Sequence, residues 1–219
     1  MKLLKPAHIA LLLPCLPLSP IALADSEPLL LDPSVITGSR SASPSFDLPY
    51  SVDSINLEQI NDGQLGINAS EVLSRVPGLV VQNRQNYAQD LQISSRGFGA
   101  RSAFGVRGIK LIADGIPATT PDGQGQAATF NLDTAERIEV LRGPAATLYG
   151  SNAGGVIQMF SRDGEGPPRI GVETLVGSDG LSKNHLSAEG AADDVGFVLD
   201  ASRMDTDGYR DHSAARRDQ

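Results

Sequence analysis

The sequence predicts an α+β unit over residues 50–162, followed by antiparallel strands of the membrane-spanning type over residues 169–219. Two observations predict the first part: short apolar runs have strand or helix spacing, and three long polar loops separate them. A third predicts the second part, because segments of about nine to eleven residues with weak alternation and short turns are typical of transmembrane β-strands. The 23 glycines and 14 prolines agree with many tight turns.

The segment from Glu136 to Arg162 organises the α+β unit. Its apolar, β-prone start predicts a strand, which Gly143-Pro144 ends because proline offers no N–H to a ladder. Residues 145–149 favour a helix, and residues 156–160 favour a second strand. Gly154-Gly155 lies between them as a hinge that tolerates unusual backbone angles. This segment is therefore predicted to be architectural.

The other helices and strands of the unit are predicted from the spacing of apolar residues and from the residues that end each segment. Ala69, Val72, Leu73 and Val76 share one helix face, and Pro77-Gly78 ends that helix. The same reasoning predicts a helix over 57–61, strands over 51–55, 79–81, 92–95 and 110–113 with Ile116, and a turn or half-helix over 132–135.

The long loops carry an excess of arginine in an otherwise acidic chain. Arg84, Arg96, Arg101 and Arg107 face little acidic charge between residues 84 and 108. Arginine binds carboxylates and phosphates through paired N–H groups. The loops are therefore predicted to form either an anion-binding face or salt bridges to another surface.

The N-terminal residues predict export. Residues 1–24 have two lysines, an apolar stretch and an Ala-Leu-Ala cleavage pattern, which is typical of a signal peptide. Residues 25–49 are rich in Ser, Pro and Asp and are predicted to be flexible. Within them, residues 34–38 form a short β-prone island that suits strand addition to a partner, although an unremarkable linker segment has the same pattern.

The C-terminal part begins after a linker at 164–168. Ile170, Val172, Thr174 and Val176 share one face of a strand, and further strands are predicted over 183–191 and 196–204. A soluble β-meander is the alternative. Three strands cannot close a barrel, so the chain is expected to be truncated.

Composition and motifs exclude several functions. The formal charge is −8, whereas general nucleic-acid binding needs a basic surface. There is no Walker A pattern, no GxSxG motif and no set of nucleophile, base and oxyanion donors. His185 and His212 are isolated in the sequence. We therefore predict no enzyme, no cofactor and no metal site.

Three motifs in order give a family resemblance. VPGLVV (76–81), DGIP (114–117) and RIEVLRGPAATLYGSNAGGVIQMFSR (137–162) resemble the plug domain of TonB-dependent outer-membrane receptors. The resemblance implies a plug over 50–163 with a small mixed sheet, short helices and long loops, followed by the first strands of a β-barrel in the outer membrane. It also implies a TonB box, the site to which periplasmic TonB adds as a strand, at Ser34, Val35, Ile36, Thr37 and Gly38.

The resemblance also implies a ligand face. Residues 76–126 and GYRDHS (208–213) are most similar to the branch that contains the pyrroloquinoline quinone receptor, whose ligand is an anionic tricarboxylate. A ferric siderophore is the alternative ligand, and a free-standing periplasmic binding module is the alternative protein class. The outward-facing plug loops then supply the candidate ligand-binding residues: Arg84, Tyr87, Arg101, Phe104, Asp122 and Gln124.

Glu139 and Arg142 are the candidate contacts between plug and barrel. Their odd spacing places them on opposite faces of a strand. They are therefore predicted to have separate partners, one of them on the barrel wall, rather than to pair with each other.

Overall fold

The computed structural model describes residues 35–36, 43–44, 47–83, 86–87, 89–103, 105–150, 152–193 and 195–219. The predicted signal peptide over 1–24 lies outside the described residues, as do Ser34, Thr37 and Gly38.

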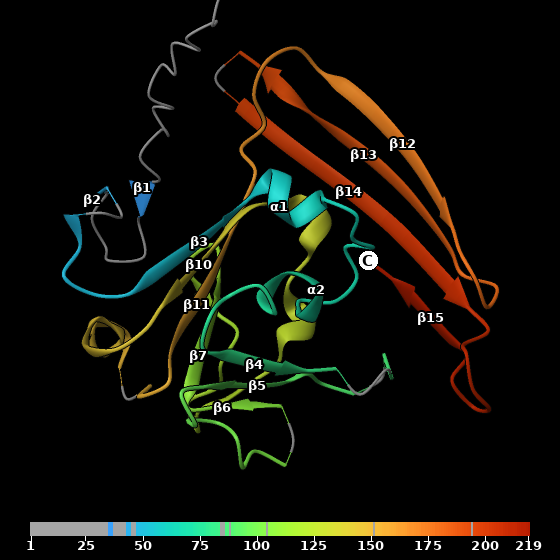
Figure 1. Cartoon of the computed structure of the whole chain (residues 1–219). Coiled ribbons are helices and arrows are strands. Elements are labelled where there is room, and N and C mark those ends of the chain that lie inside the picture. Colours follow the sequence, from blue (N-terminus) through green and yellow to red (C-terminus); the bar gives the residue numbers. More distant parts are fainter. Residues whose placement is uncertain are drawn as a thin grey trace, which may run out of the picture. The chain divides into compact units, whose positions relative to one another are not determined.

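The α+β unit is built on a five-stranded mixed sheet, as predicted (Figure 1). The strand order is β3-β10-β11-β7-β8. The pairing of β11 with β7 is parallel, and the other pairings are antiparallel. The strands are β3 (Val52–Asn56), β10 (Ala135–Leu141), β11 (Gly155–Ser161), β7 (Ile109–Ala113) and β8 (Ile116–Pro117).

Two short helices pack on this sheet. Helix α1 (Leu57–Asn61) starts at a capping box, in which Asn56 and Gln59 exchange side-chain and backbone hydrogen bonds. Helix α2 (Ser70–Leu73) is shorter than predicted, because Arg75 and Val76 continue with i→i+3 hydrogen bonds until Pro77 stops the turn. Val72 and Leu73 are fully buried and anchor α2 in the core.

The long loops are pinned by pairs of short strands. Strand β4 (Leu79–Gln82) pairs with β5 (Gln92–Ser95), and β6 (Val106–Arg107) pairs with β9 (Gln124–Gly125). The second pair was not predicted, and it joins the arginine-rich loop to the loop that follows β8. Three 3-10 helices complete the unit: η2 (Ala127–Thr129), η3 (Leu132–Thr134) and η4 (Pro144–Tyr149).

The glycine hinge is confirmed by close backbone packing. Gly155 has φ +126°, and a Cβ there would lie 2.5 Å from the Leu141 carbonyl oxygen. A Cβ on Gly154 would lie 2.7 Å from the Gly108 carbonyl oxygen. Any side chain at these positions would push β11 away from β10 and β7.

A four-stranded antiparallel sheet follows in the order β12-β13-β14-β15 (Figure 1). One of its faces is exposed and apolar, including Ile170, Val172 and Val176 as predicted, together with Leu186 and Leu199. The charged strand β15 was not predicted. The bounds are β12 (Arg169–Val176), β13 (Ser182–Ala192), β14 (Val195–Thr206) and β15 (Ala215–Asp218). Among the described residues, no helix has the length and apolar character needed to cross a membrane.

The β-prone island of the N-terminal segment forms a strand. Strand β1 (Val35–Ile36) pairs antiparallel with β2 (Ser43–Pro44), with Ile36 opposite Ser43. Val35 and Ile36, the two described residues of the island, are therefore extended and pair with a neighbouring segment of the same chain.

Candidate functional site

Two of the predicted ligand loops come together at the β6–β9 pair. Arg101 is exposed in the loop between β5 and β6, and Asp122 is exposed just before β9. Gln124 is half-buried in β9, and its amide lies against Gly105, where a Cβ would meet the Gln124 Nε2 at 3.5 Å. Arg107 Nη2 lies 3.7 Å from Asp122 Oδ2. The pairing places Arg101, Asp122 and Gln124 on loops that share one small sheet.

Asp122 is held in its charged form by the turn around it. Its Oδ1 accepts a short hydrogen bond from the Thr120 hydroxyl and a second bond of 3.2 Å from the Gln124 N–H. These hydrogen bonds lower the pKa of Asp122, with a smaller contribution from Arg107. The turn is therefore more stable with Asp122 ionised, at pH values above the ordinary aspartate pKa.

We expect this turn to loosen in acid. Because the folded-state pKa of Asp122 is lowered, its contribution to stability is lost as the pH falls through that lowered value. Replacing Thr120 with Val removes the strongest hydrogen bond and should raise the pKa of Asp122 toward its ordinary value. Carboxyl-carbon NMR titration measures the shift, and Thr129→Val is the control, because the Thr129 hydroxyl donates to the Gln126 carbonyl oxygen and not to a carboxylate. An unchanged Asp122 pKa in Thr120→Val would contradict the assignment.

Tyr87 lies in a different place from Arg101. It lines a cavity of about 540 Å³ with Ala128 and residues of β15, and a second cavity of about 150 Å³ with Tyr209 and Ser213. Burial raises the pKa of the Tyr87 phenol, and the negative charge of Glu71 raises it further. Tyr87 therefore stays neutral at physiological pH where it lines these cavities.

Two predicted ligand residues, Arg84 and Phe104, lie outside the described residues. The described candidates form two groups: Arg101, Asp122 and Gln124 at the β6–β9 pair, and Tyr87 beside β14 and β15. A ligand role for any of the six stays a prediction.

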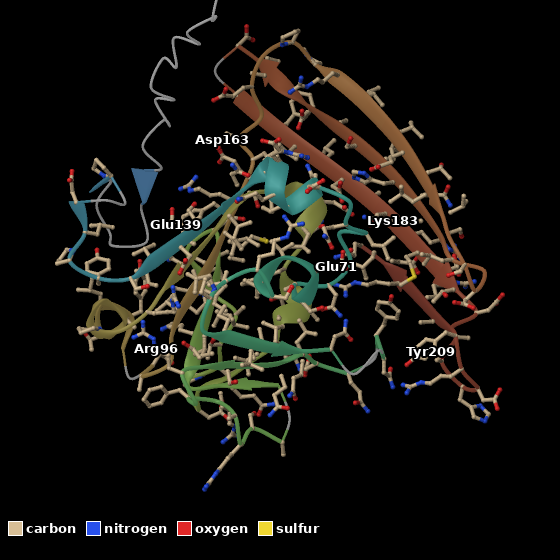
Figure 2. The ribbon with its side chains drawn as sticks, viewed as in Figure 1. Glu71, Arg96, Glu139, Asp163, Lys183 and Tyr209 are labelled. Atoms are coloured by element: carbon tan, nitrogen blue, oxygen red, sulfur yellow. The ribbon has the colours of Figure 1, made fainter. Side chains whose placement is uncertain are left out.

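A network of charged side chains joins the α+β unit to the antiparallel sheet. Lys183 of β13 is 3% exposed, and its ammonium donates hydrogen bonds of 2.6 Å to Asp133 of η3 and to the Leu65 carbonyl oxygen (Figure 2). Arg162 donates to the Asp133 carbonyl oxygen at 3.0 Å and pairs with Glu189 of β13 at 3.3 Å. These contacts fix the end of β11 and η3 against β13.

His185 belongs to the same network, so the expectation that it is isolated is wrong for the folded chain. Its Nε2 makes a short contact with Asp200 of β14, and its Nδ1 lies 3.7 Å from Glu173 of β12. Alternate positions of β13 supply Lys183, His185, Ser187 and Glu189 to one cavity. Polar residues at every second position of this strand were visible in the sequence. This alternation was the signal that could have identified the network.

Glu139 and Arg142 contact different groups of the α+β unit. The Glu139 carboxylate is fully buried and accepts a 3.0 Å hydrogen bond from Arg137. The Arg142 guanidinium binds Asp53 and the Pro77 carbonyl oxygen through short contacts, and donates to the Ser51 hydroxyl at 2.9 Å. All of these partners belong to the α+β unit. A contact of either residue with a barrel wall stays a prediction.

Comparison with known proteins identifies the α+β unit. The profile of the family described as "TonB-dependent Receptor Plug Domain" matches residues 44–157, which is more than half of the chain. The chain belongs to the TonB-dependent receptor plug family. The match covers the mixed sheet, both helices and the long loops, and it ends within β11. The α+β unit is therefore a plug domain.

Curated relatives of this plug protein are transport receptors. The hemin receptor of Yersinia pestis is 31% identical over 189 residues, which cover 82% of this chain and 26% of the relative. The vitamin B12 transporter BtuB of Vibrio vulnificus is 26% identical over 180 residues, covering 81% of this chain and 28% of the transporter. The chain spans about a quarter of the length of these relatives. One name describes a receptor and the other a transporter, and neither describes an enzyme.

Solved receptors share the fold. The ferric yersiniabactin uptake receptor FyuA of Yersinia pestis aligns with a TM-score of 0.56 at 25% identity, covering 72% of this chain and 24% of the receptor. The pyoverdine outer-membrane receptor FpvA of Pseudomonas aeruginosa aligns with a TM-score of 0.60 at 21% identity, covering 78% of this chain and 24% of the receptor. The second likeness concerns the fold alone.

Proposed function

We propose that this chain is the N-terminal part of a TonB-dependent receptor that imports a scarce small ligand across the outer membrane. The observation that carries the proposal is the plug-family match over residues 44–157, directly followed by an antiparallel sheet with an exposed apolar face. An exposed apolar strand face suits contact with lipid acyl chains. The sheet β12–β15 is then the start of the barrel wall.

Strand β1 is the proposed site at which a partner protein exerts force on the plug. Val35 and Ile36 are already extended, and within the described residues their partner β2 offers two residues. A partner that adds a longer strand can therefore replace β2 by making more backbone hydrogen bonds. Force on β1 is transmitted through residues 47–51 to β3, which is an edge strand of the plug sheet. We propose TonB as the partner that adds to β1.

The proposed ligand face comprises the plug loops around the β6–β9 pair and the Tyr87 loop. Arg101 is exposed and free to turn toward an anion, whereas the Arg107 side chain lies beside Asp122. Carboxylate-rich and catecholate-type ligands are both anionic, so an arginine fork suits either. The named relatives take up siderophores, hemin and vitamin B12, which favours a ferric siderophore or another scarce metal complex.

Pyrroloquinoline quinone is the second candidate ligand. It is supported by the arginine-bearing loops and by the resemblance of residues 76–126 and 208–213 to the receptor branch for that tricarboxylate. Calorimetry of the intact protein in detergent, with pyrroloquinoline quinone, hemin and a ferric siderophore titrated in turn, distinguishes the candidates. Saturable 1:1 binding of one of them supports the proposal. Absence of binding by all three would contradict the ligand classes proposed here.

We expect Arg101→Ala to weaken binding of the anionic ligand about tenfold. The reason is the loss of one charge-assisted contact, worth about 1.4 kcal/mol. Arg169→Ala is the matched control, since that arginine is 73% exposed on β12, outside the plug loops. Calorimetry on the two variants measures the difference. An unchanged dissociation constant in Arg101→Ala would remove Arg101 from the ligand face.

A further inference from the structure

Three side chains that commonly bind metals converge where the plug meets the antiparallel sheet. Asp133 comes from η3 of the plug, His185 from β13 and Asp200 from β14. One potential ligand atom of each lies within 4.8 Å of the others. We propose that Asp133, His185 and Asp200 bind one divalent transition-metal ion, of the zinc or manganese kind, and that the ion links the plug to the sheet.

The Asp133 carboxylate has an oxygen available for such an ion. Its side chain is 10% exposed, and its Oδ1 accepts a hydrogen bond of 2.6 Å from Lys183. Its Oδ2 is buried and accepts no hydrogen bond from any described residue. A buried carboxylate oxygen without a partner is costly, and a cation beside it removes that cost.

His185 and Asp200 are oriented as metal ligands usually are. The His185 Nε2 faces Asp200, while its Nδ1 lies 3.7 Å from the Glu173 carboxylate. A carboxylate on the far ring nitrogen is the usual outer partner of a metal-binding histidine. Asp200 is held in turn by the Asn131 amide, which donates to its Oδ1 at 3.2 Å. The ligands are thus supported from behind by plug and sheet residues.

The charge of the cluster also favours a divalent cation. Asp133, Asp200 and Glu173 carry three negative charges, and Lys183 supplies one positive charge. With a neutral imidazole, a net charge of about −2 is left, which one divalent ion balances. Nearby Glu189 pairs with both Arg162 and Arg169, and the Arg169 side chain is 73% exposed to solvent, which screens its charge. The competing arrangement is a direct contact of His185 with Asp200 and Glu173 without an ion.

The geometry and the types of donor atom limit which metal ions this site can bind. Bonds of about 2.1 Å at tetrahedral angles place two ligand atoms of one zinc ion about 3.4 Å apart. Ligand atoms that lie up to 4.8 Å apart, and the short His185–Asp200 contact, therefore have to shift by about 1 to 1.5 Å to bind one ion. A cavity of about 270 Å³, lined by Asp133, Glu173, Lys183 and His185, leaves room for water to complete the coordination. One imidazole and two carboxylates suit zinc or manganese better than copper(I), which prefers sulfur.

The test is metal binding by the intact protein in detergent. Zinc is titrated in competition with a chromogenic chelator, and manganese binding is measured separately by electron paramagnetic resonance. We expect 1:1 binding of zinc in the wild type, and at least tenfold weaker binding in both His185→Asn and Asp200→Asn. His212→Asn is the matched control, because His212 is exposed in a turn at φ +62°, a conformation that asparagine tolerates. Its binding should equal that of the wild type.

Several results would overturn the proposal. Absence of zinc and manganese binding in the wild type would show that the cluster is a histidine–carboxylate ion pair only. Equal zinc affinity in the wild type and His185→Asn would place the ion elsewhere. Loss of zinc binding in His185→Asn with full zinc binding in Asp200→Asn would rule out a site formed by Asp133, His185 and Asp200 together. Metal content measured by X-ray fluorescence on each folded variant gives the same decision without the chelator.

Discussion

Replacing Lys183 with Met is expected to detach the plug locally from the antiparallel sheet. The ammonium of Lys183 is buried and binds Asp133 and the Leu65 carbonyl oxygen. Its loss leaves the nearly buried Asp133 carboxylate without its cation, which costs about 3–5 kcal/mol. Hydrogen exchange of the backbone amides around Leu65 and Asp133 should then accelerate by about 100-fold or more, since 1.4 kcal/mol corresponds to a factor of ten.

A double variant separates the contact from general damage to the fold. Lys183→Met combined with Asp133→Leu replaces the ion pair with apolar side chains, so no unpaired charge is left. We expect the exchange rates of the double variant to return to within about tenfold of the wild type. Such a recovery would show a large coupling energy between Lys183 and Asp133, as expected for two residues in contact. Equal protection in Lys183→Met and the wild type would contradict the claim that this pair fastens plug to sheet.

Replacing Arg142 with Met is expected to release the edge strand β3. The Arg142 side chain is 8% exposed and joins Asp53 of β3 to Ser51 and to the Pro77 carbonyl oxygen. Removing it unpairs a partly buried carboxylate and a carbonyl, at a cost of about 3 kcal/mol. The amides of β3 should exchange about 100-fold faster, while those of β11 change little.

Arg107→Met is the matched control for Arg142. Arg107 is 56% exposed and lies 3.7 Å from Asp122, so its loss should cost less than about 1 kcal/mol. Arg142→Lys tests the paired geometry, because a lysine retains the charge but cannot reach both Asp53 and Pro77 with a fork. We expect intermediate exchange. Rates in Arg142→Met equal to those in Arg107→Met would show that Arg142 does not hold β3.

The regular elements could be predicted because their apolar spacing is local. Strands β10, β11 and β12 and helix α1 lie within a residue or two of their predicted positions. Residues 144–149 form a 3-10 helix with i→i+3 hydrogen bonds. The helix-favouring composition of this segment predicts a helix but does not distinguish a 3-10 helix from an α-helix. The pair β6–β9 was missed because two-residue strands among glycines leave no periodicity.

The contact network could not be predicted from separate positions. Lys183 and Asp133 are 50 residues apart in the chain, and His185 and Asp200 meet only because β13 and β14 are adjacent strands. The polar alternation of β13 indicated an inward face but not its partners. The spacing of Glu139 and Arg142 predicted that they do not pair with each other. It did not identify Asp53 as the partner of Arg142, because Asp53 lies near Arg142 only through the pairing of β3 with β10.

The proposed import mechanism depends on force applied at β1. Ile36→Pro removes a backbone donor from β1 and blocks strand addition by TonB. Ser43→Pro is the control, since it breaks only the β1–β2 pair and leaves β1 unchanged. Uptake of the radiolabelled ligand by cells is the measurement, with cross-linking to TonB in parallel. We predict that Ile36→Pro lowers uptake to the level of cells without TonB, whereas Ser43→Pro retains it. Full uptake and unchanged cross-linking in Ile36→Pro would contradict a role of β1 in TonB-driven import.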